Sequence, residues 1–165
     1  MAKKIAVRVD DRLIHGQCMV RLIPYFKIKH IIVVDDFTAS NPTMKMVVEK
    51  IAMPGIKNEV FTVATAIEPI QKAISDDVGT MIVFRFPEIA KELFDKVADL
   101  PKSLMVGPVQ KQTDDAIQVN IGTFLNSTQF SSLSYIKNEK NVDVYFQTVP
   151  DMKKVSWEEV EKHYK

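Results

Sequence analysis

A strand, a charged loop and the first turn of a helix follow one another in the stretch KIAVRVDDRLIHGQ, residues 4–17. Residues 4–9 alternate as a strand does, with Ile5 and Val7 on one face and Arg8 on the other. An arginine that leaves a buried strand sideways is tolerated near the carboxyl end of a parallel sheet, where the crevice of an open α/β fold lies. The stretch therefore predicts a parallel α/β sheet with a polar site at the end of its first strand.

The loop of this stretch holds side chains that are suited to bind and accept a phosphoryl group. Neutral imidazole is a nucleophile with an ordinary pKa of about 6.5, so His15 is available at neutral pH. Arg8 and Arg12 are expected to hold the phosphoryl oxygens through charge-assisted hydrogen bonds, which requires no metal ion or other cofactor. One of Asp10 and Asp11 is expected to accept the far ring N–H of His15, and the other to tether an arginine.

The residues after His15 add the start of a helix to this site. Gly16 is expected to let the backbone turn closely, and the helix that begins with Gly16 and Gln17 directs free N–H groups toward His15. Pro24 is expected to end or kink this helix. A phosphoryl group on His15 is therefore predicted to contact the helix start as well as the two arginines.

Residues 10–17 resemble the active-site signature of the IIB proteins of the mannose, fructose and sorbose family of the bacterial phosphoenolpyruvate-dependent sugar phosphotransferase system. The resemblance implies that His15 accepts a phosphoryl group on Nδ1 from a phosphohistidine of a IIA protein. It also implies that His15 passes the group to an incoming sugar, together with the membrane components IIC and IID. The implied activity is that of a protein-phosphohistidine-sugar phosphotransferase.

The likeness continues with lower specificity along nearly the whole chain, which implies a single IIB domain over residues 1–165. The chain departs from the family where residues 22–24 replace a usual tryptophan, and where Gly107-Pro108 replaces paired glycines. Neither departure touches the His15 loop, so both concern the partner surface and the sugar preference. The sugar itself, and whether the protein forms a homodimer, do not follow from these residues. The less specific matches are residues 30–36, 104–109 and 141–150.

Strands and helices alternate along the rest of the chain. Continuous apolar strands are expected at residues 30–34 and 80–84, as in a sheet that is covered on both faces. Another strand is expected at residues 59–63, followed by a helix with a capping box over residues 65–68. This alternation indicates a parallel sheet with right-handed crossovers.

The last third of the chain has a different pattern. Residues 117–125 and 142–149 alternate at period two, and one helix lies between them. This pattern favours antiparallel pairing at an edge. The predicted fold is an open, mostly parallel α/β sheet with helices on both faces and an antiparallel edge strand near the C-terminus.

Two further strand ends place polar residues at the same carboxyl edge as His15. Asp35 and Asp36 follow the strand at 30–34, and Arg85 follows the strand at 80–84. The aspartates suit metal ligands or, more commonly, a helix cap or a solvated turn, whereas Arg85 suits a third phosphate-binding arm or an ion-pair partner. An exposed apolar rim is also expected around the loop, because the donor is a protein. Its candidate residues are Leu13, Ile14 and Phe37.

Simpler interpretations compete with the phosphoryl site. A histidine in a loop is usually a solvated side chain, and pairs of arginine and aspartate are usually surface ion pairs of small energy. The complete motif between a strand and a helix favours the site at His15, whereas His30 and His163 lack that setting. Cys18 suits a nucleophile with His15 as its base, but a cysteine within a helix is more often a small buried hydrophobic residue.

The composition excludes several classes of function. A net charge of +1 over 165 residues predicts no bulk attraction to nucleic acid or membranes. No apolar run reaches the roughly 18 residues of a membrane span, and residues 1–4 lead into a strand without the core of a signal peptide. A cytoplasmic protein is predicted, and the resemblance implies peripheral association with a membrane permease. Cys18 is the single cysteine, so neither an internal disulfide nor a cysteine-cluster metal site is expected.

Two other functions are open from the sequence. A non-enzymatic regulator with the IIB fold would report phosphorylation of His15 to another protein. A nucleotide- or phosphate-binding module is disfavoured, because the turn after the first strand has neither G-x-G-x-x-G nor G-K-[ST]. The phosphocarrier is therefore the favoured hypothesis.

Overall fold

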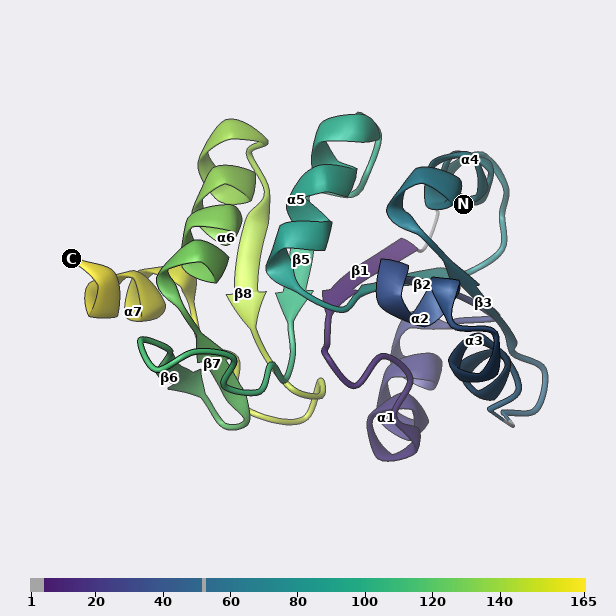
Figure 1. Ribbon diagram of the computed structural model, residues 1–165, viewed down its shortest axis with the longest axis horizontal. Helices are drawn as coiled ribbons and strands as arrows, with labels where there is room; N and C mark the ends of the chain where they lie inside the picture. The colour runs from purple at the N-terminus through teal and green to yellow at the C-terminus, as the bar shows by residue number, and fades with distance from the viewer. Residues whose placement is uncertain (1–4, 52) are drawn as a thin grey trace.

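The computed structural model describes residues 5–51 and 53–165, and a six-stranded sheet runs through it (Figure 1). The strand order is β3-β2-β4-β1-β5-β8, and every pair of neighbours in this sheet runs parallel. The open, mostly parallel sheet that the sequence predicts is confirmed. Lys4, the expected first residue of β1, lies outside the described residues. The strands are β1 (Ile5–Val9), β2 (His30–Val34), β3 (Lys57–Phe61), β4 (Thr80–Phe84), β5 (Ser103–Val106) and β8 (Asp143–Phe146).

Helices cover both faces of the sheet, as predicted (Figure 1). One face is covered by α1 (Gly16–Phe26) and α3 (Pro42–Glu49). The other face is covered by α4 (Val63–Ser75), α5 (Pro87–Lys96) and α6 (Ser127–Glu139). The short helical elements are α2 (Asp36–Ser40), α7 (Trp157–Glu161) and the 3-10 turn Lys162–Tyr164. No helix in the described ranges has the length and apolar character needed to cross a membrane.

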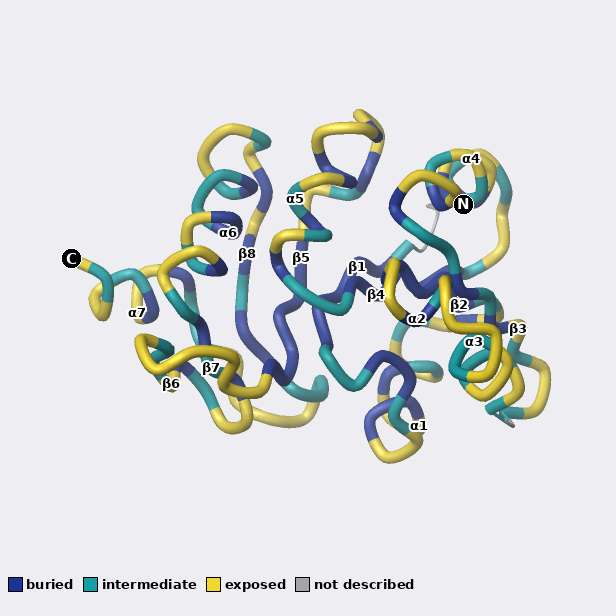
Figure 2. Tube along the Cα trace, in the orientation of Figure 1, coloured by how far each residue is buried: buried dark blue, intermediate teal, exposed yellow. Residues whose placement is uncertain are grey.

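Strand β2 shows how the two apolar layers form. Ile31 and Val33 belong to the layer with α1, whereas Ile32 and Val34 belong to the layer with α4. All four side chains are fully buried, and Figure 2 shows the central strands buried and the outer faces of the helices exposed. Each such side chain contributes roughly 1.5–3 kcal/mol on burial. Packing on both faces therefore holds the strands in register and aligns their carboxyl ends.

The antiparallel pairing expected near the C-terminus lies in a separate sheet. β6 (Ile117–Asn120) and β7 (Thr123–Leu125) pair with each other, whereas the edge strand β8 runs parallel to β5. The expectation that the edge strand is antiparallel is wrong. Helix α6 lies between β7 and β8 and returns the chain to the edge of the sheet where the parallel strands begin, so β8 runs in the same direction as β5. The period-two pattern of β8 reports that alternate residues are buried, not the direction of the strand.

Helix α4 begins earlier than expected. Thr62 is its N-cap: Thr62 Oγ1 accepts a hydrogen bond from Thr65 N at 3.1 Å, and Thr65 Oγ1 accepts one from Thr62 N at 3.0 Å. Strand β3 consequently ends at Phe61, and the capping box lies three residues before the expected box over residues 65–68. Both side chains of the true box are threonines, so it departs from the Ser/Thr-x-x-Glu/Gln pattern.

Helix α1 continues past Pro24 to Phe26. Pro24 lies in the last turn, so its missing N–H interrupts only one hydrogen bond of the helix. Lys27 is the C-cap of the helix, with a left-handed φ of 56°.

Candidate active site

Four strands end at one carboxyl edge of the sheet, and the residues that follow them lie close together. In the register of the sheet, Val9 of β1 is paired with both Phe84 of β4 and Val106 of β5. Phe84 is also paired with Val34 of β2. The residue that follows each strand is therefore brought to the same edge. These residues are Asp10, Asp35, Arg85 and Gly107.

Asp10 is the centre of the charged network at this edge. Its carboxylate is fully buried and accepts hydrogen bonds from Arg8 Nη2 at 3.0 Å, Arg12 N at 3.0 Å and Arg12 Nε at 3.3 Å. A buried carboxylate is stable when its charge is paired and its oxygens are hydrogen-bonded, and two guanidinium groups do both here. Asp10 is thus the aspartate that tethers the arginines.

Arg8 links Asp10 to the segment that follows β8. It is 1% exposed, and its terminal N–H groups donate to Asp10 Oδ2, to the carbonyl oxygens of Thr148 (2.8 Å) and Gln147 (3.3 Å), and to Met105 Sδ. With these donors occupied, Arg8 positions the loop in this arrangement. Direct contact between Arg8 and a phosphoryl group stays a prediction.

Arg12 is the arginine of the loop that is accessible. Its side chain is 29% exposed, and its Nη2 lies 2.9 Å from Sγ of Cys18, which is buried. Burial lowers the pKa of Arg12, but the hydrogen bond and the charge of Asp10 outweigh it and raise the pKa above its ordinary value. Arg12 therefore presents a permanent positive charge. Asp10 and Cys18 hold its guanidinium, and part of the side chain is exposed to solvent.

His15 is the N-cap residue of α1. Its backbone is extended, and its carbonyl oxygen accepts a hydrogen bond from Met19 N at 2.9 Å. The side chain is partly exposed, and Nδ1 is buried with no hydrogen-bond partner among the described residues. The expected hydrogen bond from the His15 ring N–H to an aspartate is absent from the described residues, because Asp10 accepts from the arginines and Asp11 accepts from Gln110 N at 2.5 Å.

The tight turn before the helix is at Leu13 and not at Gly16. Leu13 has a left-handed φ of 60°, and its N–H donates to Asp10 O at 3.0 Å. A Cβ on Gly16 would meet no heavy atom within 4 Å, so the expectation of a close turn there is wrong. Gly16 and Gln17 are exposed, and the N–H groups of this first turn have no partner within the helix.

The apolar rim differs from the expected one. Leu13 and Ile14 are each 6% exposed and pack in the core layer beneath α1, so the expectation that both face a partner is wrong. The turn at Leu13 buries both side chains beside Met19. Phe37 of α2 is 62% exposed, as the rim requires.

Asp11 anchors the segment that follows β5. Its N–H donates to Pro108 O at 3.0 Å, and its Oδ2 accepts the hydrogen bond from Gln110 N. Burial raises the pKa of Asp11, and the nearby charge of Asp10 raises it further. The bond from Gln110 and the charges of two nearby arginines lower the pKa without cancelling the rise.

Asp35 and Asp36 act as structural caps. Asp35 Oδ2 accepts hydrogen bonds from Thr38 N at 3.1 Å, Thr38 Oγ1 at 2.6 Å and Arg85 Nη1 at 3.2 Å. Asp36 Oδ1 accepts one from Val63 N at 2.7 Å. Across residues 5–51 and 53–165, no group of three or more His, Cys, Asp or Glu side chains could hold a metal ion. These contacts support the cap interpretation of the two aspartates.

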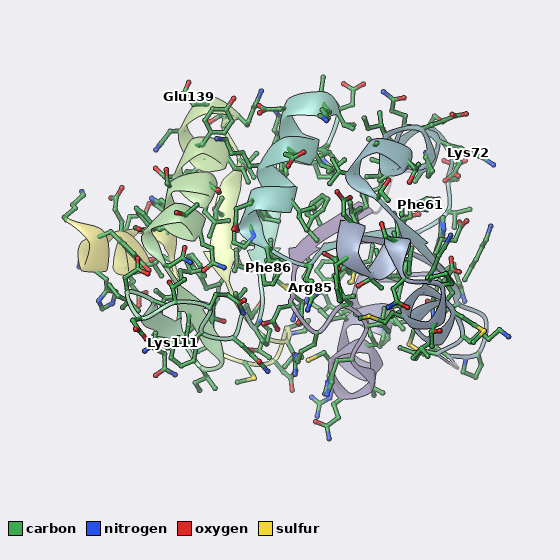
Figure 3. All side chains as sticks on the ribbon, viewed as in Figure 1. Phe61, Lys72, Arg85, Phe86, Lys111 and Glu139 are labelled. Atoms are coloured by element: carbon green, nitrogen blue, oxygen red, sulfur yellow. The ribbon has the colours of Figure 1, made fainter. Side chains whose placement is uncertain are left out.

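Arg85 lies near two aromatic rings at this edge. Its Cζ is 5.2 Å from the ring centroid of Phe86 and 5.8 Å from that of Phe37, and Figure 3 shows Arg85 and Phe86 close together where β4 ends. The ion pair with Asp35 confirms one of the two interpretations of Arg85. Its side chain is 28% exposed, and a role as a further phosphate-binding arm stays a prediction.

The fold that carries this site is also found in known proteins. The family model for the "PTS system sorbose subfamily IIB component" matches residues 5–165. The chain belongs to this IIB family. The crystal structure of manxB from Thermoanaerobacter tengcongensis is similar over 99% of both chains, with 30% identity and a TM-score of 0.84. The IIBSor domain of the sorbose permease from Klebsiella pneumoniae shares the fold over 98% of both chains, with a TM-score of 0.85 at 18% identity.

Known bacterial relatives of this IIB chain differ in length. The N-acetylgalactosamine-specific phosphotransferase enzyme IIB component 1 of Escherichia coli (strain K12) is 26% identical over 147 residues, which are 88% of this chain and 90% of that protein. The mannose-specific EIIAB component of the same strain is 33% identical over 86 residues, which are 52% of this chain but only 27% of that protein. The IIB chain therefore matches about a quarter of that longer relative.

Sequence reasoning missed three contacts of the site. They are the contact of Cys18 with Arg12, the carbonyl contacts of residues 147–148 with Arg8, and the close packing of Gly107 on Arg8. Contacts made by backbone carbonyl groups cannot be predicted from the types of the side chains. The one available signal was the resemblance of residues 141–150 to the closing strand of the family, which says nothing about Arg8.

Proposed function

We propose that this IIB chain is a phosphocarrier that accepts a phosphoryl group on His15 from a phosphohistidine of a IIA protein and transfers it to a sugar during uptake. The observation that supports this most strongly is the position of His15 at the start of α1, in the same loop as Arg12, which Asp10 holds in place. Phosphoryl transfer depends mainly on positioning and on electrostatic stabilisation. A nucleophile, a fixed cation and free N–H groups supply both.

The proposed reaction has two displacement steps. An imidazole nitrogen of His15 forms a bond to phosphorus while the bond to the donor histidine breaks. A sugar hydroxyl oxygen then forms the new bond to phosphorus, the bond to His15 breaks and the hydroxyl proton is released. Arg12 and the N–H groups of Gly16 and Gln17 stabilise the phosphoryl oxygens. Because Nδ1 of His15 is buried, transfer to this atom requires the ring to turn outward first.

The proposed partners follow from the same reaction. The donor is a IIA protein that approaches over an exposed surface including Phe37, and the acceptors are the membrane components IIC and IID with their sugar. The protein would then be cytoplasmic and associate peripherally with the permease, as a single IIB domain over residues 1–165. Sugar phosphorylation by membranes that contain IIC and IID distinguishes this carrier from a regulator that only reports its phosphorylation state.

Transfer from a phosphorylated IIA protein, followed by intact mass, tests the proposal. The wild-type chain should gain one phosphoryl group, and His15→Gln should gain none. His163→Gln is the matched control, because His163 is an exposed histidine in the C-terminal 3-10 turn, and it should be phosphorylated like the wild type. Normal phosphorylation of His15→Gln would contradict the proposed role of His15.

A further inference from the structure

The segment that follows β8, residues 147–152, contacts both flanks of the loop that carries His15. Before the loop, Arg8 of β1 donates to the carbonyl oxygens of Gln147 and Thr148. After the loop, Arg21 of α1 forms an ion pair with Asp151. Residues from the far end of the chain thus hold the two elements between which His15 lies.

The side chain of Gln147 closes this segment into a compact turn. Gln147 is 9% exposed, and its Nε2 donates to Pro150 O at 3.2 Å and to Met152 O at 2.8 Å. Within the turn, Met152 N donates to Val149 O at 3.0 Å. The Gln147 backbone N–H also donates to Val106 O of β5, at 3.0 Å. Gln147 therefore joins the end of the sheet to the turn: its backbone N–H holds β5, and its side-chain amide closes the turn whose carbonyl groups face Arg8.

The contacts continue without interruption from this turn to Arg12. Arg8 has little room to move. It is 1% exposed, and its guanidinium fills the space beside Gly107, where a Cβ would lie 2.6 Å from Arg8 Cζ. Its Nη2 is shared between Thr148 O and Asp10 Oδ2, and Asp10 in turn holds both the backbone N and the Nε of Arg12.

We infer that Gln147 is a positioning residue for phosphoryl transfer, an inference that rests on the proposed function. It acts through Arg8 and Asp10 on the guanidinium of Arg12. When the amide is removed, the turn is no longer closed and its carbonyl groups leave Arg8. Arg8 Nη2 is then held by Asp10 alone, so Asp10 Oδ2, which also accepts from Arg12 Nη2 at 3.4 Å, loses a fixed donor and orients the guanidinium of Arg12 less well. The rate of transfer falls, whereas the donor-binding surface around Phe37 is unchanged.

Gln147→Leu tests this inference, with Gln129→Leu as its matched control. Gln129 is also a buried glutamine with hydrogen bonds to the backbone, but it belongs to the capping box of α6. Both variants should lose stability in thermal unfolding. In rapid-quench transfer from phosphorylated IIA, Gln147→Leu should lower kcat about ten- to hundredfold with KM little changed, because a small misplacement of a catalytic group has effects of this size. Gln129→Leu should leave both constants close to the wild type.

A double-mutant cycle with Arg12→Ala shows whether the effect passes through Arg12. In the Arg12→Ala background, Gln147→Leu should slow transfer much less than it does alone, because its target is already absent. If Gln147→Leu does not fold, Gln147→Asn, whose shorter amide cannot reach both carbonyl groups, should show the same pattern at smaller size. Unchanged kcat, equal slowing by Gln129→Leu, or full additivity with Arg12→Ala would each overturn the inference. Absence of any phosphorylation in the wild type would instead overturn the proposed function and the inference with it.

Discussion

Asp10 carries the charge balance of the loop at the scale of single residues. Its carboxylate contacts both Arg8 and Arg12, and it does so without exposure to solvent. Two guanidinium groups near one another would repel without it. The loop therefore depends on a buried anion for its shape as well as for the orientation of Arg12.

Asp10→Asn should be strongly destabilising. Removal of one partner from a buried ion pair leaves the other charge unpaired, at a cost of about 3 kcal/mol or more. Denaturant unfolding measures this loss, and Asp95→Asn is the matched control, because Asp95 pairs with Lys140 at the surface. The control should lose far less stability. Equal effects of the two substitutions would contradict the central role given to Asp10.

Asp11→Asn should stabilise the protein at neutral pH. Burial raises the folded-state pKa of Asp11 above its ordinary value of 3.8, so between these two pKa values the folded state binds more protons than the unfolded state. The stability of the wild type therefore falls as pH rises through that interval. Asparagine keeps an oxygen that accepts the hydrogen bond from Gln110 N, but its side chain does not ionise, so it carries no negative charge at neutral pH.

Unfolding measured from pH 3 to pH 7 tests this expectation for Asp11. The two proteins should be nearly equal in stability at the acid end, and the asparagine variant should gain relative to the wild type as pH rises. A variant that is less stable at neutral pH, or a difference that does not depend on pH, would show that the ionised carboxylate is favoured in the folded state.

At the scale of elements, the contact between β1 and the end of β5 depends on a missing side chain. Gly107 follows β5, its N–H donates to Val9 O at 2.7 Å, and the Arg8 guanidinium packs where its side chain would be. Gly107→Ala should therefore displace Arg8 and cost about 1–3 kcal/mol, as other overpacked sites do. Gly16→Ala is the control, since its Cβ enters open space and should leave stability unchanged or slightly higher.

Thermal unfolding of the two alanine variants gives the comparison directly. Phosphoryl transfer by Gly107→Ala should also be slower, because Arg8 and Asp10 hold Arg12. If Gly107→Ala were as stable and as active as the wild type, the close packing of Gly107 on Arg8 would not be a constraint on the site.

Several elements could be predicted from the sequence because their signals are local. The strands at residues 30–34 and 80–84 are continuous apolar runs in a sheet covered on both faces, and both have the expected bounds. The start of α4 was misplaced because two threonines form its capping box. The direction of β8 was misjudged because alternating burial is the same for a parallel and an antiparallel edge strand.

At the scale of the whole molecule, the site is assembled from parts that are distant in the sequence. The loop motif around His15 predicted the tethering of an arginine by an aspartate, which the contacts of Asp10 with Arg12 confirm. It did not predict that Arg8 is enclosed by the segment after β8, or that Leu13 and Ile14 are buried. Those features depend on which strands are neighbours, and the strand order places β1 beside β5, with β8 next to β5.

The proposed role of His15 is tested by locating the phosphoryl group on the chain after transfer from phosphoenolpyruvate through the general phosphotransferase proteins and a IIA protein. Nitrogen-15 NMR of the phosphorylated protein, with peptide mapping under conditions that preserve acid-labile phosphate, identifies the atom. We predict one phosphoryl group on the imidazole of His15, at Nδ1. A phosphoryl group on Cys18, His30 or His163, with His15 unmodified, would contradict it.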